Sequence, residues 1–153
     1  MRTVRDGDGD RYLLVKRSGE SSLVRDPETG EERYLPNAAL EPVDESALAA
    51  AAAAVPAPAR RACSAVRDDE SLGLLVEIDR RGPIGVRALL SEYDRCESDL
   101  HGLLGEFRAA GLIEEADVAG ELGPERGYAT TGTGAEAVRL LRAAGEAGET
   151  DDA

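Results

Sequence analysis

The chain has 153 residues, of which 42% are hydrophobic, and 31 acidic against 18 basic residues give it a formal net charge of −13. This length allows one core of ordinary size plus a small appendage, and it excludes two large domains. No run of about 18 apolar residues is present and the first ten residues lack the apolar segment of a secretory signal, so we expect a cytoplasmic protein without a membrane span. Two cysteines without a CxxC pair and a single histidine argue against a disulfide framework or a zinc site, and we expect no metal or other cofactor.

Residues 1–43 predict a small antiparallel β-meander. Strand-like sequences occupy residues 11–17, 21–25 and 32–36, and the segment DPETGE between the last two has the Asp, Pro and Gly of a tight turn. The apolar residues of the meander are too few for independent stability, so it is expected to pack against another element. We interpret it as a structural cap; a dimer or other protein contact, a lid and a ligand-sensing flap are the alternatives.

Residues 44–59 predict a helical linker rich in alanine and proline. Asp44 can cap a short alanine helix, which Pro56 and Pro58 then end, so this segment is expected to act as a semi-rigid connector. At the other end of the chain, residues 147–153 form an acidic tail that is expected to be disordered.

Residues 60–146 predict a series of helices. The first ends at the sequence RRGP, where Gly82 can cap the helix and the following proline prevents its continuation. A second helix is predicted from about Val86 to Tyr93, and a short polar turn leads to a third, which ends at Gly111. Apolar residues at i, i+3, i+4 and i+7 give the third helix one face for packing on a core. They are Leu100, Leu103, Leu104 and Phe107.

Two strands and a closing helix complete this part of the chain. The strands are predicted at residues 112–118 and 127–131, joined by an exposed loop, AGELGPER, and the helix runs from Ala135 to about Ala144. The order helix, helix-turn-helix, hairpin, helix is the winged helix-turn-helix plan. The predicted fold class is therefore α+β, a winged helix-turn-helix domain preceded by a small antiparallel β-meander.

Two resemblances extend this interpretation. The abundance of carboxylates and alanine, with one lysine and few aromatic residues, resembles the composition of haloarchaeal proteins, whose charges are screened over about 3 Å at 1 M salt. An acidic protein of a GC-rich genome is the alternative. The sequence SAVRDDESLGLLVEIDRRGPIGVRALLSEYDRCESDLHGLLGEFRAAGLIEE, with GYATTGTGAEAV after it, resembles the DNA-binding domain of ArsR-type winged helix-turn-helix regulators over residues 62–142.

The resemblance to ArsR-type regulators implies a set of DNA-contacting residues in the third helix, near its start and in the wing. Ser98 and the first-turn amides would hold a phosphate, His101 would reach a base edge, and Arg126 would contact a phosphate or the minor groove. The metal-sensing cysteine pair of the family is missing, because the matching stretch is PIGVRALL. The candidate DNA-binding set is completed by Arg87 of the second helix and comprises Arg87, Arg95, Ser98, His101, Gly102, Gly105, Arg108 and Arg126.

These residues predict a DNA-binding transcriptional regulator, not an enzyme, that binds double-stranded DNA as a homodimer. The alternative is a winged helix that binds a protein partner through its third helix. Residues 60–146 contain 11 arginines against 17 carboxylates, a net charge of −6, which is compatible with DNA binding only where molar salt screens the repulsion. Cys96 is expected to be a small N-cap residue, with a redox switch as the alternative hypothesis.

Overall fold

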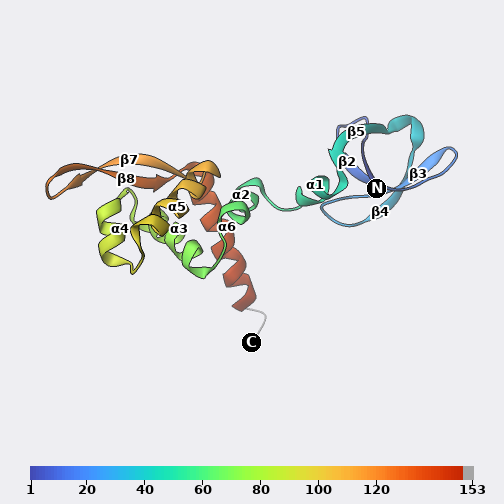
Figure 1. Ribbon diagram of the computed structural model, residues 1–153. Helices are drawn as coiled ribbons and strands as arrows, with labels where there is room; N and C mark the ends of the chain where they lie inside the picture. The colour runs from blue at the N-terminus through green and yellow to red at the C-terminus, as the bar shows by residue number, and fades with distance from the viewer. Residues whose placement is uncertain (150–153) are drawn as a thin grey trace. The chain divides into compact units, whose positions relative to one another are not determined.

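The computed structural model describes residues 1–149 and divides the chain into two compact units, residues 1–57 and a second that begins at Pro58 (Figure 1). Across the described residues the chain forms six α-helices and two antiparallel sheets, so it is an α+β protein. None of the helices within residues 1–149 has the length and apolar character needed to cross a membrane.

The first unit contains a five-stranded antiparallel sheet with the strand order β4-β3-β2-β1-β5. The three strands that the sequence predicts are present with the predicted bounds, as β2, β3 and β4. Two further strands, β1 and β5, were not predicted, and β5 occupies the start of the segment that we expected to be a linker. The strands are β1 (Arg2–Arg5), β2 (Arg11–Arg17), β3 (Ser21–Arg25), β4 (Glu32–Pro36) and β5 (Glu41–Ser46), with a 3₁₀ turn, η1 (Asn37–Ala39), before β5.

Helix α1 (Ala47–Ala52) follows β5 directly and contacts β1, β2 and β5. The prediction that Asp44 caps this helix is wrong. Ser46 is the N-cap, and its hydroxyl accepts a 3.2 Å hydrogen bond from the amide of Leu48, because the backbone remains in the sheet up to residue 46. The first unit thus has a small core of its own, built on Val4, Tyr12 and Val24.

The second unit contains five helices within its described residues. The fourth of them, α5, is the predicted third helix; it begins three residues before the predicted stripe of leucines and ends before Gly111, as expected. The closing helix α6 is longer than predicted at both ends; at its start the hydroxyl of Thr131 accepts a 3.1 Å hydrogen bond from the amide of Gly134 and lets the helix begin early. The helices are α2 (Ala57–Ala65), α3 (Asp69–Arg81), α4 (Val86–Glu92), α5 (Glu97–Ala109) and α6 (Gly132–Glu149).

The prediction of a disordered acidic tail concerns residues 147–153. Residues 147–149 are the last residues of α6, whereas residues 150–153 lie outside the described part of the chain.

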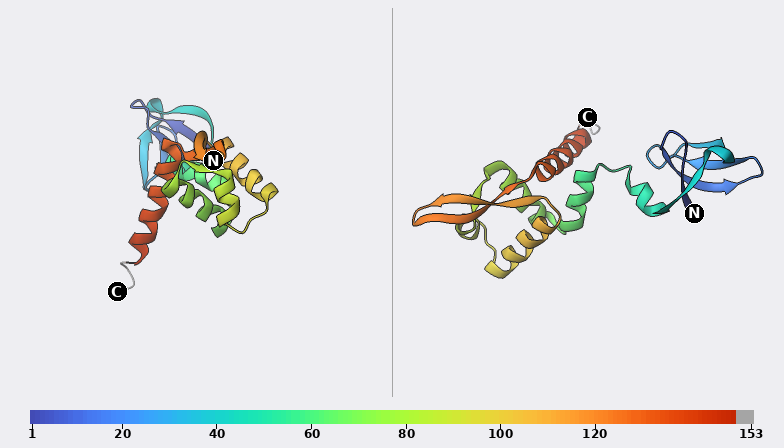
Figure 2. Two further views of the ribbon diagram at one scale, coloured as in Figure 1. Left: turned by 90° about the vertical axis from the view of Figure 1, so that its left-hand side faces the viewer. Right: turned by 90° about the horizontal axis from the view of Figure 1, so that it is seen from above.

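A long hairpin of β7 (Ile113–Gly120) and β8 (Gly123–Thr130) joins α5 to α6, and β6 (Ile84–Gly85) pairs with the outer edge of β8. The exposed loop predicted for residues 119–126 is therefore wrong: most of it is strand, closed by a two-residue turn. Glycine makes this pairing possible, since Gly123 has φ +115° and a side chain at residue 127 would lie 2.6 Å from the carbonyl oxygen of Ile84. In Figures 1 and 2 the end of the hairpin extends beyond the neighbouring helices.

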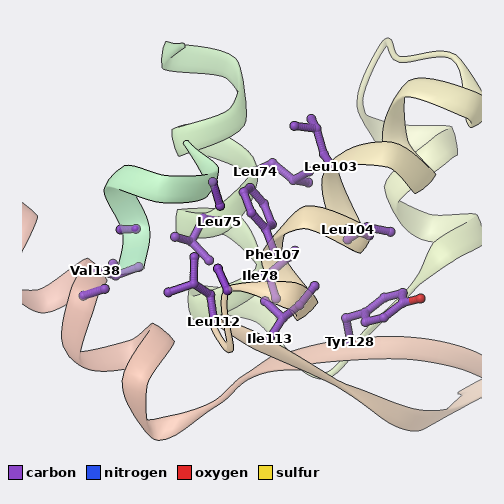
Figure 3. Packing of buried hydrophobic residues seen from close by; sticks show 14 of the residues in the cluster. Leu74, Leu75, Ile78, Leu103, Leu104, Phe107, Leu112, Ile113, Tyr128 and Val138 are labelled. Atoms are coloured by element: carbon purple, nitrogen blue, oxygen red, sulfur yellow. The ribbon is translucent and has the colours of Figure 1, made fainter. Parts of the chain in front are cut away.

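All elements of the second unit except the end of the hairpin contribute to one core (Figure 3). Phe107 points into its centre and is fully buried, as are Leu75, Ile78 and Leu112. The predicted apolar face of α5 packs on this core, and α6 adds Ala137 and Val138. This packing fixes which face of α5 points to solvent.

Candidate nucleic-acid interface

The outward face of α5 carries a stripe of very small residues. Ser98, Gly102, Gly105 and Ala109 follow at i, i+4, i+7 and i+11, opposite the buried face, and all four are exposed. A Cβ atom built on Gly102 or Gly105 would meet nothing within 4 Å. A flat partner such as a nucleic acid backbone can therefore approach the main chain of this helix closely.

The N-terminus of α5 is capped weakly. Cys96 occupies the N-cap position, as predicted, but its side chain makes no capping hydrogen bond and lies 3.3 Å from the hydroxyl of Ser98. By contrast, α3 begins with a capping box in which Asp68 and Ser71 satisfy each other's amides. The first-turn amides of α5 thus retain hydrogen-bonding capacity for an acceptor from outside, although two carboxylates, Glu97 and Asp99, lie in the same turn.

The two flanks of the outward face differ in charge. His101 and Arg108, seven residues apart, lie on one flank, whereas Asp99 and Glu106 lie on the other. Arg108 makes a 3.1 Å ion pair with Glu115 of β7, so the flank with His101 and Arg108 borders the hairpin. His101 itself lies 3.6 Å from Glu97.

Arg108 and Arg126 share one carboxylate. Glu115 lies 3.1 Å from Arg108 and 3.8 Å from Arg126, and both arginine side chains are at least 49% exposed. Asp117 is the cross-strand neighbour of Arg126. The two guanidinium groups are thus brought together where α5 meets the hairpin by one acidic residue of β7, Glu115.

The four predicted arginines do not converge on one surface. Arg87 pairs with Glu125 of β8 at 3.8 Å, next to Arg126 in the sequence. Arg95 is only 20% exposed and turns toward α3, where it pairs with Glu70 at 2.6 Å. The structure therefore brings together Arg108 and Arg126, places Arg87 near the same hairpin, and sets Arg95 apart.

Each predicted arginine has a glutamate partner that was not predicted from the sequence. These partners come from β7, β8 and α3, and each lies outside the element that carries its arginine. The one available signal was alternation along the hairpin, which puts Glu115 on the same face as Tyr128 once the register is known. The glutamates are as much a part of this surface as the arginines.

The first unit has a separate open recess, of about 1120 Å³, between β1, β5 and α1. Two of its residues have buried oxygen atoms without a hydrogen-bond partner in the described structure, namely Oγ1 of Thr3 and Oε2 of Glu45. Across residues 1–149 no group of three His, Cys, Asp or Glu side chains is placed to hold a metal ion, and both cysteines are free and exposed.

Residues 1–142 match the model of a family of unknown function, DUF7346. Comparison with curated proteins gives no match, and comparison with solved structures gives none either.

Proposed function

The chain belongs to the DUF7346 family, and we propose that its second unit is a winged helix-turn-helix domain that binds duplex DNA. In this proposal α4 and α5 form the helix-turn-helix, α5 is the recognition helix, and the β7–β8 hairpin is the wing. The observation that carries it is the bare outward face of α5 beside the Arg108 and Arg126 guanidinium groups.

The shape of α5 favours the DNA major groove as its partner. This groove admits an α-helix, and a helix with only very small residues on its outward face can bring its backbone close to the sugar-phosphate chain. His101 is half exposed on the flank toward the hairpin, in a position to reach a base edge. Ser98 and the first-turn amides offer donors to a phosphate.

Electrostatics set the conditions under which this surface would bind. Ion pairs between exposed side chains contribute about 0–1 kcal/mol, so Arg108 and Arg126 can exchange Glu115 for a phosphate at little cost. In dilute buffer the net charge of −13 would repel DNA. Molar salt, such as that of the haloarchaeal cytoplasm that the composition resembles, screens this repulsion and leaves contacts and shape to decide affinity.

The proposed biological role is transcriptional regulation by a homodimer. Winged helix-turn-helix regulators bind two half-sites through two-fold symmetry, and one isolated domain offers few phosphate contacts.

The test is fluorescence anisotropy of the full chain with a duplex from its own upstream region, in about 2 M KCl, with a scrambled duplex as control. We expect saturable binding that prefers the native duplex, weakened by Arg126→Ala and by His101→Ala. Arg139→Ala is the matched control, because Arg139 is an exposed arginine of α6 paired with Glu136 in its own helix. Absence of binding by a chain that circular dichroism shows to be folded would refute the proposal.

A protein-interaction module is the second candidate. It is favoured by the glutamate partners of all four arginines and by the tip of the hairpin, where Leu122 is 87% exposed next to Glu121. A single substitution separates the two candidates. Glu115→Gln releases two guanidinium groups, so duplex affinity should rise severalfold if DNA is the partner. Glu136→Gln removes the same charge from α6 and should leave affinity unchanged; equal effects of both substitutions would count against a DNA contact at Arg108 and Arg126.

A further inference from the structure

A cavity of about 720 Å³ lies between α3 and the turn that connects α4 to α5. Its volume falls in the range of small-molecule sites, which is about 300–1,000 Å³. One wall is the outward side of α3, with Leu72, Gly73 and Val76. The opposite wall is the turn, with Tyr93, Asp94 and Arg95.

The turn is fastened to α3 at both sides of this cavity. At one side the Tyr93 hydroxyl donates a 2.5 Å hydrogen bond to Glu77 and accepts a 2.9 Å hydrogen bond from Arg81, which also pairs with Glu92 at the end of α4. At the other side Arg95 donates to Glu70 near the start of α3 at 2.6 Å. The hydrogen bond to Glu77 is the main cause, and burial the second, of a raised pKa of Tyr93. The hydroxyl group therefore stays protonated and remains a donor. The cavity is thus a preformed space held open by two polar links.

The charges at the rim of the cavity are predominantly negative. Five carboxylates line it against one arginine, a more acidic balance than that of the whole second unit. Glu70 and Glu92 are neutralised by arginines, but Asp69 and Asp94 have no ion pair in the part of the chain that the structure describes. An occupant that satisfies both the apolar wall and the unpaired rim carboxylates has an apolar body and a positive charge.

We propose that this cavity binds a lipophilic organic cation, a small molecule whose apolar body packs on Leu72, Val76 and the Tyr93 ring and whose charge faces Asp69 and Asp94. An aromatic face and nearby carboxylates are the groups by which proteins bind such cations. A neutral molecule of the same shape gains only the apolar contacts, and an anion meets repulsion at the rim.

Because of the position of the cavity, a bound molecule can change the position of α5. Arg95 lies two residues before the first residue of α5, and the same turn sets where this helix begins. A bound cation that displaces the turn therefore moves the outward face with Ser98 and Gly102. This regulatory step rests on the proposed DNA binding, whereas binding of the cation does not.

Two ions of matched shape and opposite charge test the site directly. The ¹⁵N-labelled full chain is titrated with tetraphenylphosphonium or with tetraphenylborate while its amide resonances are followed. The buffer contains about 2 M NaCl, because tetraphenylborate precipitates with potassium, and the titrations are repeated at about 0.5 M NaCl. We expect saturable shifts at Gly73, Asp94 and Arg95 with the phosphonium ion only, and tighter binding at the lower salt. Equal binding of both ions, or shifts confined to other residues, would overturn the proposal.

The chain offers a matched pair of variants at Gly73, which is exposed on α3 with open space around its Cβ position. Gly73→Phe fills the cavity and should weaken phosphonium binding at least about tenfold, a change of about 1.4 kcal/mol. Gly73→Ala leaves the cavity open and should bind as the natural chain does. Undiminished binding by the folded Phe variant would place the ligand elsewhere and refute the site.

The proposed DNA binding and the proposed cation site can be refuted independently of each other. If the phosphonium ion binds with the expected selectivity but the chain binds no duplex, the cavity stands and the DNA-binding function falls. If the chain binds duplex but not the ion, the reverse holds. If both bind, saturating phosphonium should change duplex affinity in the natural chain and not in Gly73→Phe; an unchanged affinity in the natural chain would refute the regulatory step.

Discussion

Three glycines in the second unit differ in whether the structure leaves room for a side chain. Gly102 and Gly105 face open space on α5, where glycine only weakens the helix, whereas a Cβ on Gly134 of α6 would overlap the carbonyl oxygen of Leu112. Glycine at residue 134 is thus explained by packing within the chain. Glycine at residues 102 and 105 is explained by no contact within it, which is why the proposed interface lies there.

The substitution Gly105→Ala should raise the free energy of unfolding by about 0.5–1 kcal/mol, because alanine is the better helix former and its methyl group meets no neighbour. The same methyl group should weaken duplex binding by intruding between helix and DNA. Urea denaturation and anisotropy measure the two effects. Gly134→Ala serves as the reference and should cost about 1–3 kcal/mol of stability through overpacking. A Gly105→Ala variant that binds DNA as well as the natural chain would show that the helix face is not the contact.

At the level of single residues, the sequence identified which side chains of α5 are buried and which are exposed. The stripe of three leucines and Phe107 has helical spacing, and spacing is a local property. The ion pairs could not be predicted in this way, because Glu115 meets Arg108 and Arg126 only through the register of the hairpin and its packing on α5. The predicted interface therefore included Arg95, which turns toward α3, and it lacked the glutamate partners of the arginines.

The start of α3 depends on a single charged cap. Asp68 accepts a 2.8 Å hydrogen bond from the amide of Ser71, and the hydrogen bonds with Ser71 hold the pKa of this carboxyl below its ordinary value of 3.8. A carboxyl whose pKa is lower in the folded state stabilises the fold above its unfolded-state pKa. That contribution is lost as the pH falls through the folded-state pKa.

We therefore expect Asp68→Asn, which keeps an acceptor oxygen but does not titrate, to lose less stability than the natural chain as the pH is lowered from about 6 to about 3. Urea denaturation at fixed salt, followed by circular dichroism, measures this difference. Glu114→Gln removes an exposed carboxylate of β7 and is the control for the loss of one charge. Identical pH profiles of the Asn variant and the natural chain would show that the cap does not contribute.

At the level of elements, the sequence predicted helices better than the ends of strands. Helices α4 and α5 begin where the apolar spacing and the turn residues place them. The segment 119–126 has the Gly and Pro content of a loop, but pairing across the hairpin outweighs this local preference and makes most of it strand. Strand β5 was missed for the same reason, since its partner β1 lies about forty residues away in the sequence.

At the scale of the whole molecule, the net charge of −13 is the dominant property. Self-repulsion among the carboxylates acts over about 10 Å at 0.1 M salt and about 3 Å at 1 M. We expect the melting temperature to fall as KCl is lowered from about 2 M to about 0.1 M. A variant in which four exposed carboxylates, Asp69, Asp94, Glu114 and Glu121, become amides should depend less on salt. A salt-independent melting temperature would contradict the halophilic interpretation of the composition.

The sequence also indicated a division into a β-rich part and a mostly helical part, and the structure places the boundary at residues 57 and 58. It underestimated the first part, which was expected to need support from another element. The additional strands β1 and β5 and helix α1 supply that support from within the same unit. Strands that are short and rich in charged residues, such as β1 and β5, are not recognised from the composition of the segment.

The contribution of α6 to the second core bears on how the chain folds during synthesis. Ala137 and Val138 are buried in a core whose other members begin at Ala62, so this core closes only after α6 has left the ribosome. The first unit has all its strands by residue 46 and needs none of the later sequence. We therefore expect the first unit to fold first, before α6 is available to complete the core of the second unit.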